Sequence, residues 1–306
     1  MKYLKFYKKK GLKKEDVFKY FIENTRNSIK TWNYFINWEK VETGLENVKV
    51  ELNILNSLIG SNNLEKDFIN LIQKYPGIIK VFPILAAIRD KNLEILRDYE
   101  KLSLNYDVFN FETDKVIDEA EAKNYLKFIK KSGLIRLFKN KKIKNFVDYV
   151  FGVEVGLDSN GRKNRGGALM EDIVATFIMN FTKKNPHVQY INQASASKIK
   201  DVWGIDVKVN KSSRRYDFAI FNSKNKKLFL VETNFYNGGG SKLKSVCGEF
   251  KTLFDDLKNQ GINLIWITDG IGWKTTKRPL EEAFNKLDYL FNLEMLEDGI
   301  LNELLI

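Results

Sequence analysis

The spacing of hydrophobic positions divides the chain into two parts of different character. Through about residue 130 the apolar residues recur at helical spacing, as in the segment 48–59, and turn signals stand at 60–62 and 76–77. We therefore predict a mostly helical domain over residues 1–150.

The second part alternates between helical and strand-like patterns. A Gly-rich loop at 156–167 precedes a helix over 168–181 with one apolar face. Three short runs rich in β-branched and aromatic residues then predict strands, at 188–192, 215–222 and 226–236.

The remaining segments complete a second domain over residues 151–306. Ser241 is a predicted N-cap for a helix with a clean apolar stripe through Leu257, followed by a strand at 262–268 and a helix at about 278–291. This order predicts a mixed α/β fold in which a central mixed sheet is flanked by helices on both faces.

Composition narrows the class of protein. The 306 residues contain 51 Lys+Arg and 39 Asp+Glu, a net charge of +12. Cys247 is the single cysteine of the sequence and His187 is its single histidine. A zinc site built from several Cys or His ligands is therefore excluded. The basic N-terminus lacks an apolar run with a cleavage site, and no segment is long enough to span a membrane, so we expect a cytoplasmic protein.

The basic excess favours a polyanionic partner, for which nucleic acid is the obvious candidate in a cytoplasm. A lysine-rich overall composition is the alternative. Residues 122–147 contain nine Lys or Arg and no acid, interleaved with apolar residues. This segment fits either a phosphate-contacting face or a solvated helical surface.

Two acidic residues lie at the ends of adjacent predicted strands. Asp217 stands near the start of one strand, Glu232 at the end of the next, and Asn234 two residues later on the same face. Because each acid adjoins an apolar run, a charge partner is expected. Mg²⁺ suits two carboxylates with waters, and the alternative is ion pairing with Arg214, Arg215 or Lys242.

These residues stand in segments that resemble a known family. The runs RRYDFAIF, LFLVETNFYNGGGSKLKSVCGEF and LIWITDGIGW are similar to the DpnII/MboI family of type II restriction endonucleases, in the PD-(D/E)xK nuclease superfamily. The resemblance implies a homodimeric, Mg²⁺-dependent enzyme that cuts duplex DNA at GATC with unmethylated adenine, paired with a GATC adenine methyltransferase. The helical domain would then embrace DNA or form the dimer.

The resemblance also implies roles for individual residues. Asp217 and Glu232 match the two metal-binding acids, and Glu171 matches the acid on the preceding helix. Asn234 stands where the wider fold has lysine; an amide cannot take a proton at neutral pH but can orient water. Lys242 is the alternative cation near the scissile phosphate, or else an ordinary solvated lysine.

Two further segments are candidate DNA contacts. The glycines at 238–240, with Ser241 and Lys242, precede a helix N-terminus, where backbone N–H groups of Gly239 and Gly240 can hold a phosphate oxygen; a flexible turn is the alternative. They match neither phosphate-binding nor dinucleotide-binding glycine motifs.

The predicted loop at 156–167 holds the second set of candidates: Arg162, Lys163, Asn164 and Arg165. Arginine and asparagine suit bidentate contacts with guanine and adenine, although a phosphate-facing or solvated loop fits equally. The segment 193–215 offers further polar candidates, including Gln193. Which of them reads a base stays open.

Two other functions remain compatible with these observations. One is a repair or junction-resolving nuclease on the same fold. The other is a DNA-binding module that has lost catalysis, of which Asn234 in place of lysine would be the mark.

Overall fold

The chain folds into two compact units. The computed structural model describes residues 1–98, 104–112, 116–140, 142–209 and 213–306. One unit, here called the sheet unit, comprises Met1–Thr31 with Lys163–Ile306, and the other, the helical unit, comprises Trp32–Arg162.

These boundaries differ from the predicted division into 1–150 and 151–306, chiefly at the N-terminus. The first 31 residues belong to the sheet unit because their apolar side chains, among them Phe6, Tyr7 and Phe21, are buried in its core. The Asp269 carboxylate also accepts a hydrogen bond from the Arg26 backbone N–H at 2.6 Å. Helical periodicity cannot reveal contacts so distant in sequence.

The helical unit is built mainly from short helices around an aromatic core. Its α-helices are α3 Trp38–Glu46, α4 Lys49–Leu55, α5 Leu64–Lys74, α6 Phe82–Leu85, α7 Glu119–Lys131, α8 Ile135–Lys139 and α9 Phe146–Asn160. Strands β1 Asn92–Asp98 and β2 Asn105–Asn110 pair antiparallel. The helical character is confirmed, and this two-stranded sheet is an addition that the sequence analysis missed.

The basic segment 122–147 is partly neutralised within this unit. Lys127 pairs with Asp107 of β2, and Lys130 pairs with Glu65 of α5. Lys123 pairs with Glu119 one turn earlier on α7. These contacts favour a solvated, ion-paired helical surface for that part of the segment; Lys141 lies outside the described residues.

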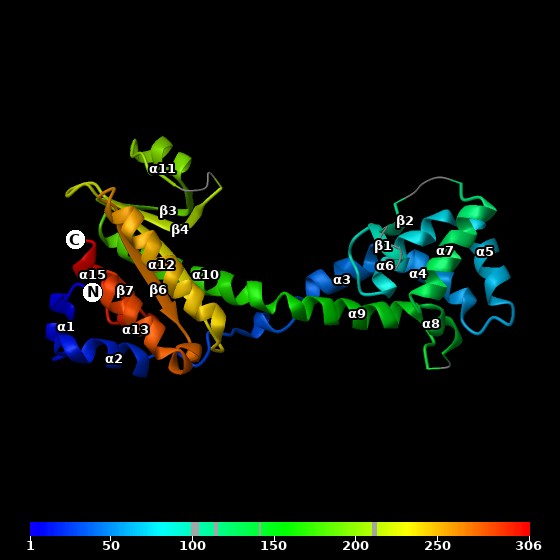
Figure 1. The fold of residues 1–306 in the computed structure, drawn as a ribbon, viewed down its shortest axis with the longest axis horizontal. Coiled ribbons are helices and arrows are strands. Elements are labelled where there is room, and N and C mark those ends of the chain that lie inside the picture. Colours follow the sequence, from blue (N-terminus) through cyan, green and yellow to red (C-terminus); the bar gives the residue numbers. More distant parts are fainter. Residues whose placement is uncertain (99–103, 113–115, 141, 210–212) are drawn as a thin grey trace. The chain divides into compact units, whose positions relative to one another are not determined.

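The sheet unit contains a five-stranded mixed sheet (Figure 1). The strands are β3 Val188–Ser195, β4 Arg215–Asn222, β5 Lys227–Phe235, β6 Asn263–Asp269 and β7 Tyr289–Phe291, adjacent in that order. The helices are α1 Lys5–Lys9, α2 Val17–Glu23, α10 Arg162–Lys184, α11 Ala196–Trp203, α12 Ser241–Lys258, α13 Lys277–Lys286, α14 Leu293–Glu297 and α15 Leu301–Leu304. Strands β3, β4 and β5 pair antiparallel, whereas β5, β6 and β7 pair parallel, so the predicted mixed sheet is confirmed.

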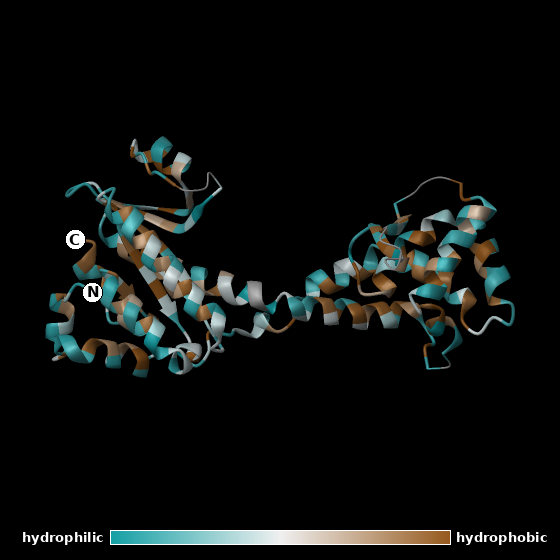
Figure 2. Ribbon diagram, in the orientation of Figure 1, coloured by the Kyte–Doolittle hydropathy of each residue, from teal (hydrophilic) through white to brown (hydrophobic). Residues whose placement is uncertain are grey.

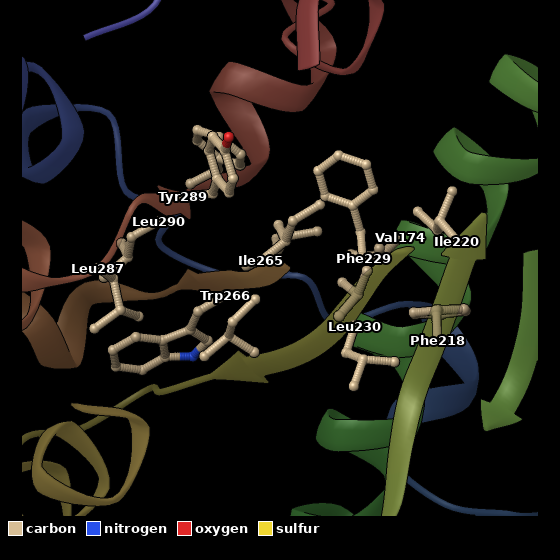
Figure 3. Close-up of a cluster of buried hydrophobic side chains, with 14 of the residues drawn as sticks. Val174, Phe218, Ile220, Phe229, Leu230, Ile265, Trp266, Leu287, Tyr289 and Leu290 are labelled. Carbon is tan, nitrogen blue, oxygen red and sulfur yellow. The ribbon is translucent and has the colours of Figure 1, made fainter. Parts of the chain in front are cut away.

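The central strands are covered on both faces. Residues 228–231 of β5 are all buried, although successive side chains point to opposite faces. Val174 of α10 lies in one cluster with Ile220 and Phe229 (Figure 3). On α12 a buried apolar stripe, including Cys247 and Phe250, faces the core, and Figure 2 shows hydrophobic and hydrophilic residues side by side on this helix.

Three predicted boundaries were wrong. The predicted loop at 156–167 is helical, because α9 runs to Asn160, Gly161 keeps helical angles and α10 begins at Arg162. The helix predicted to end near 291 stops at Lys286, before β7. Ser241 is the first residue of α12, and Gly240, at φ 138°, is its N-cap. Among the described residues, no helix is both long and apolar enough to cross a membrane.

Candidate active site

Two acidic side chains meet where strands β4 and β5 separate. The ladder between these strands ends at the pair Phe218 and Val231, so Asp217 and Glu232 are the first residues beyond it. Asp217 Oδ2 accepts hydrogen bonds from the Thr233 backbone N–H at 2.7 Å and from Thr233 Oγ1 at 2.8 Å. The carboxylate thus takes the place of a ladder carbonyl, which fixes its position at the strand end.

A third carboxylate approaches from α10. Glu171 Oε2 accepts a hydrogen bond from Gln193 Nε2 at 2.6 Å. Gln193 has a φ of 49°, a left-handed conformation that costs a non-glycine residue energy and occurs at functional sites. Glu171 lies close enough to Asp217 for the charge of Asp217 to affect its pKa, and its catalytic role stays a prediction.

Burial raises the pKa values of all three acids, and the charge of Asp217 raises those of Glu171 and Glu232 further. Burial, followed by the charge of Asp217, raises the pKa of Glu232 to about 8, against a smaller opposing effect of Arg214. Burial raises the pKa of Asp217, and the Thr233 hydrogen bonds oppose this. Burial and the charge of Asp217 raise the pKa of Glu171. A cation held between these carboxylates would favour their charged forms and so oppose both effects.

The donor set fits a hard, hydrated divalent cation. Within the described residues, no three His, Cys, Asp or Glu side chains are arranged to enclose a metal. An ion held by Asp217 and Glu232 would therefore keep most of its water ligands, as Mg²⁺ does. The three acids bring no histidine or cysteine, which protein zinc sites commonly use.

Among the described residues, Arg214 is the cation that pairs with Glu232. Its Nη2 lies 3.4 Å from Glu232 Oε1, and its guanidinium carbon lies 5.3 Å from the centre of the Tyr216 ring. In the described part of the chain, neither Arg215 nor Lys242 pairs with Asp217 or Glu232. Of the three basic residues considered as ion-pair partners, Arg214 therefore does pair with one of the acids. Its single contact with Glu232 is long, and it does not neutralise Asp217 or Glu171.

Asn234 lies on the same face of β5 as Glu232 and is held by a buried indole. Its Oδ1 accepts a hydrogen bond from Trp266 Nε1 at 2.8 Å. Trp266 and Trp273 are both fully buried. The hydrogen bond itself was not predicted, because nothing in the local sequence links residues 32 positions apart.

The glycine segment at 238–240 packs against the 3-10 helix Ile271–Thr275. A Cβ at Gly239 would lie 2.0 Å from Thr275 Oγ1, and one at Gly272 would lie 2.5 Å from the Gly238 carbonyl oxygen. Close approach therefore explains Gly239 and Gly272, whereas a φ of 138° favours glycine at position 240. Gly239, Gly240, Ser241 and Lys242 are exposed, and their contact with DNA stays a prediction.

The basic residues predicted to form a loop lie instead in the first turn of α10. Arg162 Nε donates a hydrogen bond to the Phe35 carbonyl at 3.1 Å. The side chains of Lys163 and Asn164 lie outside the described residues, and Arg165 is half-buried. A role of these residues in DNA binding stays a prediction, now with a helical rather than a loop geometry.

The raised pKa of Glu232 predicts a pH-dependent stability in the presence of a chelator. Unfolding releases the proton, because the unfolded pKa is 4.5 and the folded value about 8. The free energy of unfolding should therefore fall as the pH rises from about 4.5 to about 8. Urea unfolding in EDTA should show a smaller fall for Glu232→Gln than for wild type.

A matched control for this measurement is Asp255→Asn, which removes an exposed carboxylate that pairs with Lys286 at 2.7 Å. This variant should keep the pH dependence of the wild type, since surface pairs contribute little. An identical fall in wild type and Glu232→Gln would show that Glu232 titrates normally.

Known proteins are similar over nearly the whole chain. Residues 17–303 match the DpnII restriction endonuclease family. The type II restriction enzyme MjaIII of Methanocaldococcus jannaschii is 47% identical, covering 94% of this chain and 99% of that protein. LlaDCHI of Lactococcus lactis subsp. cremoris is 40% identical, covering 96% of each chain. DpnII of Streptococcus pneumoniae is 36% identical, covering 93% of this chain and 96% of its own. The chain therefore belongs to the DpnII family of type II restriction endonucleases.

Proposed function

We propose that this restriction endonuclease cuts duplex DNA at GATC with unmethylated adenine, using Mg²⁺ held by Asp217 and Glu232. The observation that carries the catalytic part is the cluster of Asp217, Glu232 and Glu171. The pKa values of all three are raised, and among the described residues Arg214 is the one cation that pairs with any of them. The GATC specificity is supported by the similarity of segments 214–221, 228–250 and 264–273 to the DpnII/MboI pattern.

The proposed reaction is hydrolysis of a phosphodiester. A water oxygen bonds to phosphorus, the bond from phosphorus to one ester oxygen breaks, and the departing oxygen receives a proton. When bound, Mg²⁺ would lower the pKa of water and stabilise charge on the phosphate. Asp217 and Glu232 would hold the ion, and Thr233 would keep Asp217 oriented. Asn234 can position water by hydrogen bonding but cannot act as the base.

The proposed enzyme acts as a homodimer and is paired with a GATC adenine methyltransferase, which would protect the host's own sites. GATC is a palindrome, so it presents two equivalent half-sites and two scissile phosphates, which a two-fold dimer matches.

We expect sedimentation of the protein on a GATC duplex to give two protomers per site. Affinity should fall steeply with salt, because phosphate contacts release counterions. A duplex of shuffled sequence is the control, and it should bind more weakly at every salt concentration. A single protomer on the duplex during complete double-strand cutting would contradict the dimer.

One digestion separates this proposal from the two alternatives. Purified protein with Mg²⁺ is incubated with unmethylated plasmid and, separately, with a four-way DNA junction that lacks GATC. The proposal predicts discrete plasmid fragments and an intact junction. A junction-resolving nuclease would instead cut the junction, and an inactive binding module would bind the plasmid and cut neither substrate.

A further inference from the structure

The amide of Asn234 has its orientation set by a rigid aromatic cluster. Trp266 is fully buried, stacks on Phe250 of α12 with ring centres 4.1 Å apart, and meets Trp273 edge-on at 5.8 Å. Its Nε1 lies 2.8 Å from Asn234 Oδ1. An indole N–H can only donate, so the amide oxygen must be the atom that faces it.

This contact leaves the NH₂ group of Asn234 pointing away from Trp266. Asn234 is half-buried and shares its face of β5 with Glu232. Among the described residues, its NH₂ group has no hydrogen-bond partner. The amide is therefore a fixed donor, with two N–H bonds available to an oxygen atom beside the carboxylates.

We propose that Trp266 is a positioning residue that holds Asn234 as a hydrogen-bond donor to the attacking water or to a phosphate oxygen. This inference rests on the proposed function. It explains how asparagine can occupy the position at which the PD-(D/E)xK pattern, which this sequence resembles, has lysine. Both side chains offer N–H hydrogen-bond donors to the site. A lysine at position 234 has no acceptor, and would leave the buried Trp266 N–H without a partner, which is costly.

The activity test uses Trp266→Phe, which removes the N–H and keeps a ring that can stack on Phe250. Trp203→Phe is the control, because Trp203 of α11 donates an indole bond of the same 2.8 Å length to an amide oxygen, Gln189 Oε1 of β3, and its ring lies against Phe221. We expect Trp266→Phe to lower kcat about tenfold or more with little change in KM, since a loosened positioning group costs rate. Trp203→Phe should keep kcat within about twofold.

Coupling separates positioning from a general structural effect. In an Asn234→Ala background, Trp266→Phe should lower kcat little further, because the group that it positions is already gone. The proposal is overturned if Trp266→Phe cuts as well as Trp203→Phe, or if it lowers kcat equally in both backgrounds.

A readout independent of cleavage tests the contact itself. In protein labelled with ¹⁵N at its five tryptophans, the indole resonance missing from Trp266→Phe belongs to Trp266. Asn234→Ala should shift that resonance and speed its exchange with solvent, whereas the Trp273 resonance should change less. An unchanged Trp266 resonance would overturn the contact. If the wild type cuts no DNA, the proposed function fails instead, so the two failures are distinguishable.

Discussion

Asp217→Asn and Glu232→Gln are each expected to lower the rate of DNA cleavage about a thousandfold or more. Each change removes one of two anionic oxygens proposed to hold the metal ion, and with it the activation of water and the stabilisation of charge on the phosphate. The substitutions keep side-chain size, and Glu232→Gln also removes a charge whose burial is unfavourable. Binding to a GATC duplex should therefore persist while cleavage is lost.

The measurement is single-turnover cleavage beside a binding assay on the same duplex. Asp255→Asn serves as the control, because it removes an exposed carboxylate from α12 that pairs only with Lys286 among the described residues. Cleavage near the wild-type rate by either site variant would remove that residue from the proposed catalytic set. Loss of cleavage together with loss of the folded state would be detected by circular dichroism and would require the milder variant Glu232→Asp.

Methylation of the GATC adenine at N6 is the second change with a large expected effect. The N6 amino group is a major-groove donor, and a methyl group there crowds a bidentate contact from an asparagine or glutamine side chain. One good base contact is worth about 1–3 kcal/mol, and displacement of the scissile phosphate adds to that loss. We expect cleavage to fall about a hundredfold or more.

Matched oligonucleotides provide the test, one with methylated adenine inside GATC and one with methylated adenine outside it. The second should be cut like unmethylated DNA. Equal cleavage of these two oligonucleotides and of unmethylated DNA would contradict the proposed sensitivity. Preferential cleavage of the oligonucleotide methylated inside GATC would show the opposite sensitivity.

Local sequence patterns predicted the part of the sheet unit that carries the acids. The runs before Asn222 and Phe235 are rich in β-branched and aromatic residues, so β4 and β5 fall within the predicted strands. Their register then follows from the turn between them, and it places Asp217 and Glu232 side by side, directly beyond the end of the β4–β5 ladder. The apolar stripe of α12 likewise follows from helical spacing.

The errors arose where distant contacts decide the structure. Glycine and asparagine in 156–167 predicted a loop, but Gly161 adopts helical angles and the helical pattern continues from α9 into α10. The N-terminal helices have ordinary amphipathic patterns, which do not show that they join the sheet unit. The contact of Trp266 with Asn234 depends on the parallel pairing of β5 and β6.

Mapping of the DNA ends tests the central claim most directly. Unmethylated plasmid is digested by the protein with Mg²⁺, and every new end is sequenced, beside identical digests with Asp217→Asn and with EDTA. We expect all wild-type ends to fall at one fixed position in GATC on both strands, and neither comparison digest to give new ends. Ends at another sequence would contradict the proposed specificity, and GATC ends from Asp217→Asn or in EDTA would contradict the proposed metal site.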